Sequence, residues 1–124
     1  MGINFNQALG AQTDALRLRA ERTRILASNI ANESTPGYQA RDIDFAASLR
    51  AATEQRESGD GGLSLGSDGE ALAYRVPFHP SQDDNTVELG VEQATFSQNA
   101  SDFQTSLTFL SMKLKGLAKA IEGQ

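Results

Sequence analysis

The sequence predicts a mainly α protein in which long N- and C-terminal helices pair as an antiparallel coiled coil. Apolar residues recur at heptad spacing near both ends of the 124-residue chain. Between them, residues 53–86 are rich in glycine and acidic residues. Because glycine raises the entropic cost of ordering a backbone, we expect this middle segment to be flexible and to contain little β structure.

The first predicted helix covers residues 3–31, within an N-terminal helical segment 1–32. Its heptad seam is weak, because threonine and alanine occupy several of its positions. The members of this seam are Leu9, Thr13, Leu16, Ala20, Thr23, Ala27 and Ile30. A second partial stripe consists of Ala11, Ala15, Leu18 and Ile25 and is interrupted by Arg22. Two partial apolar faces favour contact with more than one neighbour, although an imperfect helix of a small bundle would look the same.

The helix is expected to end within residues 27–38, Ala-Ser-Asn-Ile-Ala-Asn-Glu-Ser-Thr-Pro-Gly-Tyr. The last four have the order of a type II turn, since proline presets φ at the second position and glycine supplies a positive φ at the third. Residues 33–52 are therefore expected to form a turn and a short arm. Alternating acids and apolar residues at 42–45 favour a strand, whereas 46–52 favour a helix, so both forms of the arm remain open.

The middle segment holds five glycines between Ser58 and Gly69, which is typical of a loop or a hairpin tip. Residues 71–78 alternate loosely between apolar and other residues. They are a candidate edge strand, which Pro77 or Pro80 would end.

The C-terminal segment 87–124 contains the strongest periodic signal. Its seam steps by four and three residues without a polar member, which predicts a helix that needs a partner along most of its length. The members are Phe96, Ala100, Phe103, Leu107, Leu110, Leu114, Leu117 and Ile121. Asn85 or Thr86 is expected to cap the N-terminus of this helix, and Gly123 is a natural stop.

Pairing of the two helices along their seams is expected to leave apolar faces for neighbouring subunits. We expect helix pairing and assembly to use Leu9, Leu16, Ala20 and Ile30 together with all eight members of the C-terminal seam. Off that seam, Phe109 and Met112 are interpreted as part of a docking face rather than as ordinary core.

The composition argues for a protein that is completed by partners. Only 39% of residues are hydrophobic and 6% aromatic, which is lean for a small domain that must fold alone. The net charge of −5 divides into +2 for residues 1–41, −8 for 42–95 and +1 for 96–124. Such a chain lacks the contiguous basic face of a nucleic-acid binder. The arginines at 17, 19, 22 and 24 can pair with Asp14 and Glu21 and favour a solvated or inter-subunit ion-pairing face.

Catalytic and metal-binding patterns are not found in the sequence. There is no cysteine, and His79 is the single histidine, so a cofactor, a metal centre or an enzymatic role is not expected. The paired carboxylates at Asp42 and Asp44 and at Asp83 and Asp84 lack the spacing of a calcium loop. No apolar run is long enough to span a membrane, and no cleavable secretory leader is visible.

Three stretches resemble the bacterial flagellar axial proteins, the subunits of rod, hook and hook junction. The first is the signature Ala27, Ser28, Asn29, Ile30, Ala31, Asn32, then Thr35, Pro36, Gly37 and Tyr38; the others are residues 39–45 and 106–117. Together they are most similar to the flagellar basal-body rod proteins, and among these to the subunit of the proximal rod. The similarity covers roughly residues 9–50 and 85–123.

The resemblance implies a structural subunit that assembles with itself and other rod subunits into a hollow helical shaft, which transmits torque and passes export substrates. It also implies the rod's basal adaptor and the flagellar export gate as partners, a place in the periplasmic rod, and export without a cleaved signal peptide. The alternative is a soluble helical adaptor or export chaperone that binds one amphipathic partner helix.

The chain departs from the family pattern at two positions. Asp84 stands where the family has glycine in Asp-Gly-Asn-Thr-Val, and Phe103 stands where it has tyrosine. A different turn geometry and the loss of one hydroxyl hydrogen bond are expected there.

Overall fold

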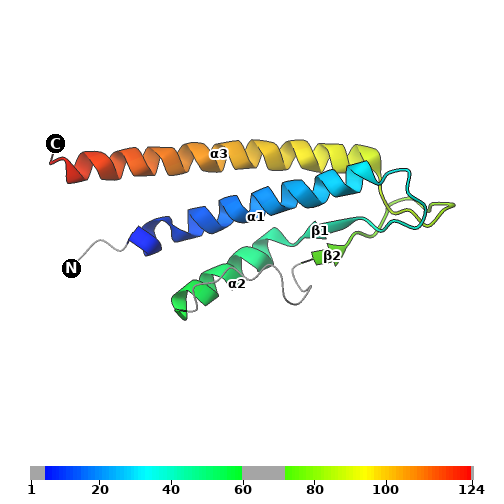
Figure 1. The fold of residues 1–124 in the computed structure, drawn as a ribbon, viewed down its shortest axis with the longest axis horizontal. Coiled ribbons are helices and arrows are strands. Elements are labelled where there is room, and N and C mark those ends of the chain that lie inside the picture. The colour runs from blue at the N-terminus through cyan, green and yellow to red at the C-terminus, as the bar shows by residue number, and fades with distance from the viewer. Residues whose placement is uncertain (1–4, 60–71, 124) are drawn as a thin grey trace.

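The computed structural model describes residues 5–59 and 72–123. Its elements are α1 (Phe5–Ala31), β1 (Arg41–Ile43), α2 (Phe45–Glu57), β2 (Leu72–Tyr74) and α3 (Leu89–Ile121). Figure 1 shows α1 and α3 side by side and antiparallel, with α2 and the two strands on the opposite side of α1. Both described chain ends lie at one end of the molecule, and the turn after α1 lies at the other. The mainly α prediction, with paired terminal helices and little strand, is confirmed.

The short arm contains both of the structures that the sequence left open. Residues 41–43 form β1, and α2 follows directly, because the Asp44 carboxylate caps the helix by accepting a hydrogen bond from the Ala47 amide at 3.1 Å. The helix then continues to Glu57, beyond the expected end of the arm at residue 52 and into the segment assigned to loop. Apart from Ser58 and Gly59, the glycine-rich stretch up to Gly69 lies outside the described residues.

The two strands pair antiparallel in the register Arg41 to Tyr74, Asp42 to Ala73 and Ile43 to Leu72. The strand expected within residues 71–78 is thus present but limited to 72–74. This pairing brings the segment after the glycine-rich stretch back against the arm that follows α1, so both lie beside α1 (Figure 1).

The start of α3 differs from the prediction. The helix begins at Leu89 with Glu88 at the N-cap position, rather than with Asn85 or Thr86. The Asn85 side chain instead contacts the end of α1, while its Oδ1 accepts the Val87 amide at 2.8 Å. Its Nδ2 donates to the carbonyl oxygens of Asn32, Glu33 and Thr35 at 2.8–3.0 Å. The Glu33 carbonyl gains its donor in this way, whereas the Asn32 and Thr35 carbonyls also accept the Thr35 and Tyr38 amides.

Among the residues that the structure describes, the buried interior is small and only half apolar. Its buried apolar residues are Leu18, Leu26, Ala40, Ile43 and Ala52, and its buried polar residues are Asn29, Ser48, Asn85, Glu92 and Asn99. No helix among the described residues is both long and apolar enough to cross a membrane. Because so little apolar surface is buried, polar contacts determine how the elements fit together.

Candidate assembly interface

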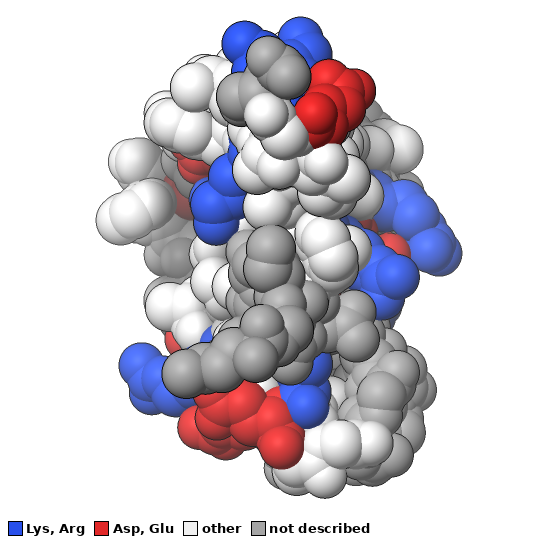
Figure 2. Space-filling view, turned by 90° about the vertical axis from the view of Figure 1, so that its left-hand side faces the viewer, with Lys and Arg blue, Asp and Glu red and all other residues white. Residues whose placement is uncertain are grey.

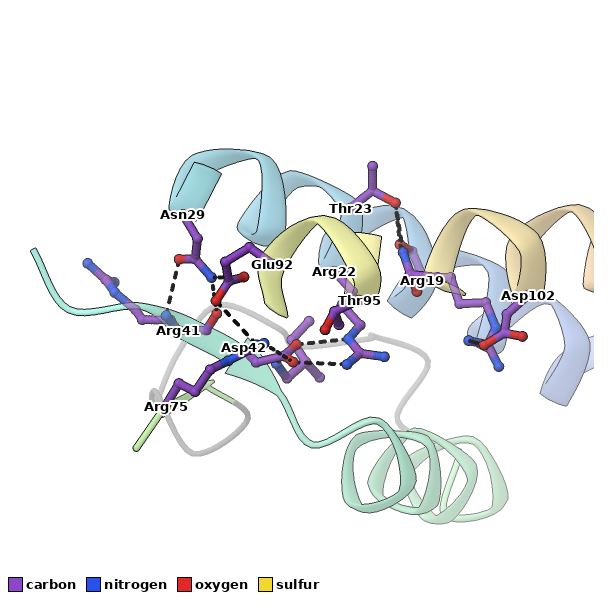
Figure 3. Close-up of polar contacts among 12 residues, drawn as sticks. Arg19, Arg22, Thr23, Asn29, Arg41, Asp42, Arg75, Glu92, Thr95 and Asp102 are labelled. Atoms are coloured by element: carbon purple, nitrogen blue, oxygen red, sulfur yellow. Dashed lines mark hydrogen bonds and ion pairs between the residues drawn. The ribbon is translucent and has the colours of Figure 1, made fainter. Parts of the chain in front are cut away.

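A row of polar side chains on α3 faces α1. Glu92 and Asn99 are fully buried and lie seven residues apart, so they are on the same face of the helix. Asn99 Nδ2 donates to the Arg19 carbonyl at 2.9 Å and to Thr23 Oγ1 at 2.8 Å. One turn further along α3, Asp102 forms a salt bridge with Arg19 at 3.2 Å. Figure 3 shows the Arg19 and Asp102 side chains side by side.

At the other end of this row, Glu92 joins both helices to the strands. Asn29 Nδ2 donates to Glu92 Oε2 at 3.0 Å and to the Arg41 carbonyl at 2.7 Å, and Asn29 Oδ1 accepts the Arg41 amide at 3.1 Å. Arg75 is the residue that follows β2, and its Nη1 lies 3.2 Å from Glu92 Oε1. The signature asparagine thus holds the edge of β1 and a buried carboxylate at the same time (Figure 3).

Asp42 extends the network by pairing with two arginines. Arg22 binds it through both carboxylate oxygens, at 2.8 and 2.9 Å, and Arg75 Nη2 donates to Oδ2 at 2.8 Å. Burial raises the pKa of the Asp42 carboxyl, but the hydrogen bond and charge of Arg22, with smaller contributions from the Ile43 amide and Arg75, outweigh it and hold the pKa below its usual value. The pKa of the Arg22 guanidinium is raised, chiefly by its hydrogen bond to Asp42. Arg22, which interrupts the second stripe of α1, therefore connects α1 to β1 within the same molecule.

The predicted reversal at residues 35–38 is present. The Tyr38 amide donates to the Thr35 carbonyl at 3.2 Å, and Gly37 has a φ of 74°. The turn is bound to the segment before α3, because the Gly37 amide donates to the Asp83 carbonyl at 2.8 Å. Asp84, in the family's glycine position, also has a positive φ, 58°, which an aspartate tolerates better than most residues.

The remaining signature positions lie on two sides of this turn. Asn29 is buried, whereas Ala27, Ser28, Ala31, Thr35, Pro36 and Gly37 are exposed and Ile30, Asn32 and Tyr38 are half-buried. The Ser28 and Tyr38 hydroxyls lie 3.2 Å apart, so the turn folds back onto the last helical turn of α1.

The apolar seam of α3 does not occupy the centre of the helix pair. Half-buried positions flank the polar row: Phe96, Phe103, Leu110 and Leu117 on α3, and Leu9, Leu16 and Ile30 on α1. The alternate seam positions Ala100, Leu107, Leu114 and Ile121 are exposed, as is Ala20. Off the seam, Phe109 and Met112 are exposed as well. The helices thus pair antiparallel as expected, but on a face rotated away from the seam, and half of that seam points outward.

Several residues of this arrangement were not found from the sequence. Leu26, which is fully buried, belongs to neither predicted stripe of α1, and Leu18 is in the stripe considered secondary. The spacing of Glu92 and Asn99 by one heptad was a signal for a polar seam beside the apolar one. Nothing local pointed to Arg75, because its partners are on other elements.

The described surface at the terminal end of the molecule carries charges of both signs. Figure 2 views this end and shows lysine, arginine, aspartate and glutamate side chains interspersed, with uncharged surface between them. The protein thus has two long paired helices, a polar interface between them and an outward apolar row on α3. These features are typical of an α-helical subunit of a larger assembly.

Comparison with known proteins identifies the assembly. Residues 9–39 match the family model described as flagella basal body rod protein. The chain is 47% identical to flagellar basal body rod protein FlgB of Cereibacter sphaeroides, over 97% of this chain and 98% of that protein. Identity to FlgB of Salmonella typhimurium is 43%, over 96% of each chain, and to FlgB of Aeromonas hydrophila 40%, over 100% and 99%. The chain belongs to the FlgB family and is a structural subunit of the flagellar basal body rod.

Proposed function

We propose that the chain polymerises in the proximal rod by burying the outward row of α3 against neighbouring subunits. The observation behind this is the exposure of Leu107, Leu114 and Ile121 within a seam that has no polar member over 96–121. Burying one leucine side chain contributes about 1.5–3 kcal/mol. A row of such side chains, repeated in each subunit, supplies enough free energy for stable association.

The contact is heterologous and open, so repetition gives a helical tube rather than a closed ring. Its partners are other copies of this chain and other rod subunits. By family resemblance, the rod's basal adaptor and the export gate lie at its base, export substrates pass through its channel, and the subunit reaches the periplasmic rod through the flagellum's own export apparatus.

Sedimentation of the purified protein over a range of concentrations tests the proposal. We expect open-ended association of the unmodified chain and loss of association in Leu107→Asp, since a charge in an apolar interface costs several kcal/mol. Thr108→Asp is the matched control, because it places the same charge one residue away at another exposed position of α3. A small complex of fixed size would instead favour the adaptor or chaperone function. Equal association of Leu107→Asp and the unmodified chain would rule out the row as the interface.

A further inference from the structure

The large exposed apolar side chains of the described residues fall into two groups. Tyr74, Val76 and Phe78 form one, which we call the strip. The other, which we call the terminal group, consists of Phe5, Leu107, Phe109, Met112, Leu114 and Ile121. The segment holding the strip contacts the start of α3, where Arg75 pairs with Glu92. At 1.5 Å per residue, Leu107 lies about 22 Å further along the helix than Glu92 and Leu114 about 33 Å, so the groups cannot meet within one molecule.

The strip is exposed but its backbone is held in place. The Arg75 amide donates to the Ala40 carbonyl at 2.9 Å, and its guanidinium group points inward to Asp42 and Glu92. The Phe78 amide donates to the Glu88 carboxylate at 3.2 Å. Val76 and Phe78 remain 85% and 79% exposed. Three adjacent apolar side chains presented on a fixed backbone are typical of an interface that is organised before its partner arrives.

Glu88 is part of this support. Its carboxylate also accepts the His79 amide at 3.2 Å and lies 3.1 Å from His79 Nδ1. The hydrogen bonds from the Phe78 amide and then His79 lower the pKa of Glu88, so the carboxylate stays ionised and keeps the end of the strip in place. Pro77, between the two exposed residues, restricts the backbone further.

We propose that the strip of one subunit docks on the exposed α3 row, Leu107 and Leu114, of a second copy of this chain. This inference rests on the proposed polymerisation and assigns the surface that faces the row. A heterologous polymer needs two different, complementary surfaces on each subunit, and the strip and the row are two of the apolar surfaces that the described residues display; Phe109 and Met112 lie on the other side of α3. Their sizes agree, since Tyr74 to Phe78 spans about 13 Å in an extended chain and Leu107 to Leu114 about 10.5 Å in a helix.

Acidic residues outnumber basic ones beside the strip, although the Arg41 guanidinium lies 5.8 Å from the centre of the Tyr74 ring, and lysines lie beyond the row. Exposed Asp83 and Asp84 follow the strip, and Glu88 lies against it. Exposed Lys115 and Lys119 are on α3 beyond Leu114. Contact between the strip of one copy and the row of the next brings acidic residues toward basic ones, whereas contact between two strips or two rows brings like charges together.

Two complementary variants test the proposal. Val76→Asp/Phe78→Asp destroys the strip and keeps the row, and Leu107→Asp/Leu114→Asp destroys the row and keeps the strip. Each alone should remain monomeric, with the association constant lowered by at least about 100-fold, because two buried apolar side chains are lost in each case. Mixed, they should form a 1:1 dimer, because one intact strip meets one intact row and neither end can continue. Sedimentation velocity measures both results, and far-UV circular dichroism checks that the helices are intact.

Ser81→Asp beside the strip and Thr108→Asp beside the row are matched controls that should polymerise normally. If the unmodified chain polymerises and the strip variant does so equally, the strip inference is wrong and the proposed function stands. If both variants are monomeric and their mixture gives no dimer, the strip does not dock on the row. An unmodified chain that stays monomeric at every concentration overturns the proposed polymerisation itself.

Discussion

Arg75→Met tests whether the buried ionic network holds the strands against the helix pair. Arg75 lies between Glu92, at 3.2 Å, and Asp42, at 2.8 Å, and its side chain is 15% exposed. Methionine keeps much of the apolar stem but removes the charge. Asp42 retains Arg22, whereas Glu92, which is fully buried, retains only the Asn29 amide. The variant therefore leaves an uncompensated carboxylate in the interior.

Removing one member of a buried ion pair typically costs 3–5 kcal/mol, and the slight exposure of Arg75 places this case near about 3 kcal/mol. Urea denaturation of the monomer, followed by far-UV circular dichroism, measures it. Glu92→Gln in the same chain should restore about 2 kcal/mol, since the amide needs no counter-charge. Arg24→Met, at an exposed residue paired with Glu21 at 3.6 Å, is the control and should cost less than about 0.5 kcal/mol. An Arg75→Met cost as small as that of the control, or no restoration by Glu92→Gln, would refute the network's role.

Three further outcomes are expected. Asn85→Ala should lower the free energy of unfolding by about 2 kcal/mol in urea denaturation, because the Glu33 carbonyl loses its donor and the Asn32 and Thr35 carbonyls keep only one backbone amide each. The pKa of Asp42 is lowered by folding, so its stabilising effect is complete above the unfolded pKa of about 3.9 and is lost as the pH falls through the folded value. An acid titration of unfolding from about pH 6 to about pH 2 should accordingly be less steep in Asp42→Asn. Gly116→Ala should stabilise the monomer by up to about 1 kcal/mol in urea, since an added Cβ meets nothing and alanine favours helix; lost polymerisation in the same variant would show that a neighbour packs there.

Local signals in the sequence were sufficient for the helices and the turn. The apolar period placed α1 and α3 to within a few residues, and the Pro-Gly order at 36–37 predicted the reversal. These features depend on neighbouring residues, which the sequence displays directly. The loop was expected to begin at residue 53, whereas α2 continues to Glu57 and has its C-cap at Ser58, directly before the first glycine of that segment.

The position of the helix interface depended on residues far apart in the chain. A heptad rule puts the most apolar stripe inside, yet here Glu92 and Asn99 are inside because α1 and Arg75, the residue after β2, supply their partners. In the same way, Asn85 has the residue type of a helix cap, but the carbonyls it binds lie about fifty residues earlier. The fold brings such partners together, so the spacing of Glu92 and Asn99 could indicate a polar seam but not the residues that face it.

The polar interface has a consequence for assembly, because it determines which face of α3 stays free. Sliding or rotating α3 to bury its apolar seam against α1 would separate Glu92 from Asn29 and Asn99 from Arg19 and Thr23. Each buried polar group left without a partner costs about 1–3 kcal/mol, so the polar contacts fix the register of the pair. Even in this register the interface is not optimal for the monomer, since Asn99 Oδ1 and Arg19 Nε are buried without a hydrogen bond in the described part of the chain. In the proposed polymer, a monomer held together by its polar face and displaying its apolar one would gain stability when copies associate, because binding to the folded state alone adds to that state's stability.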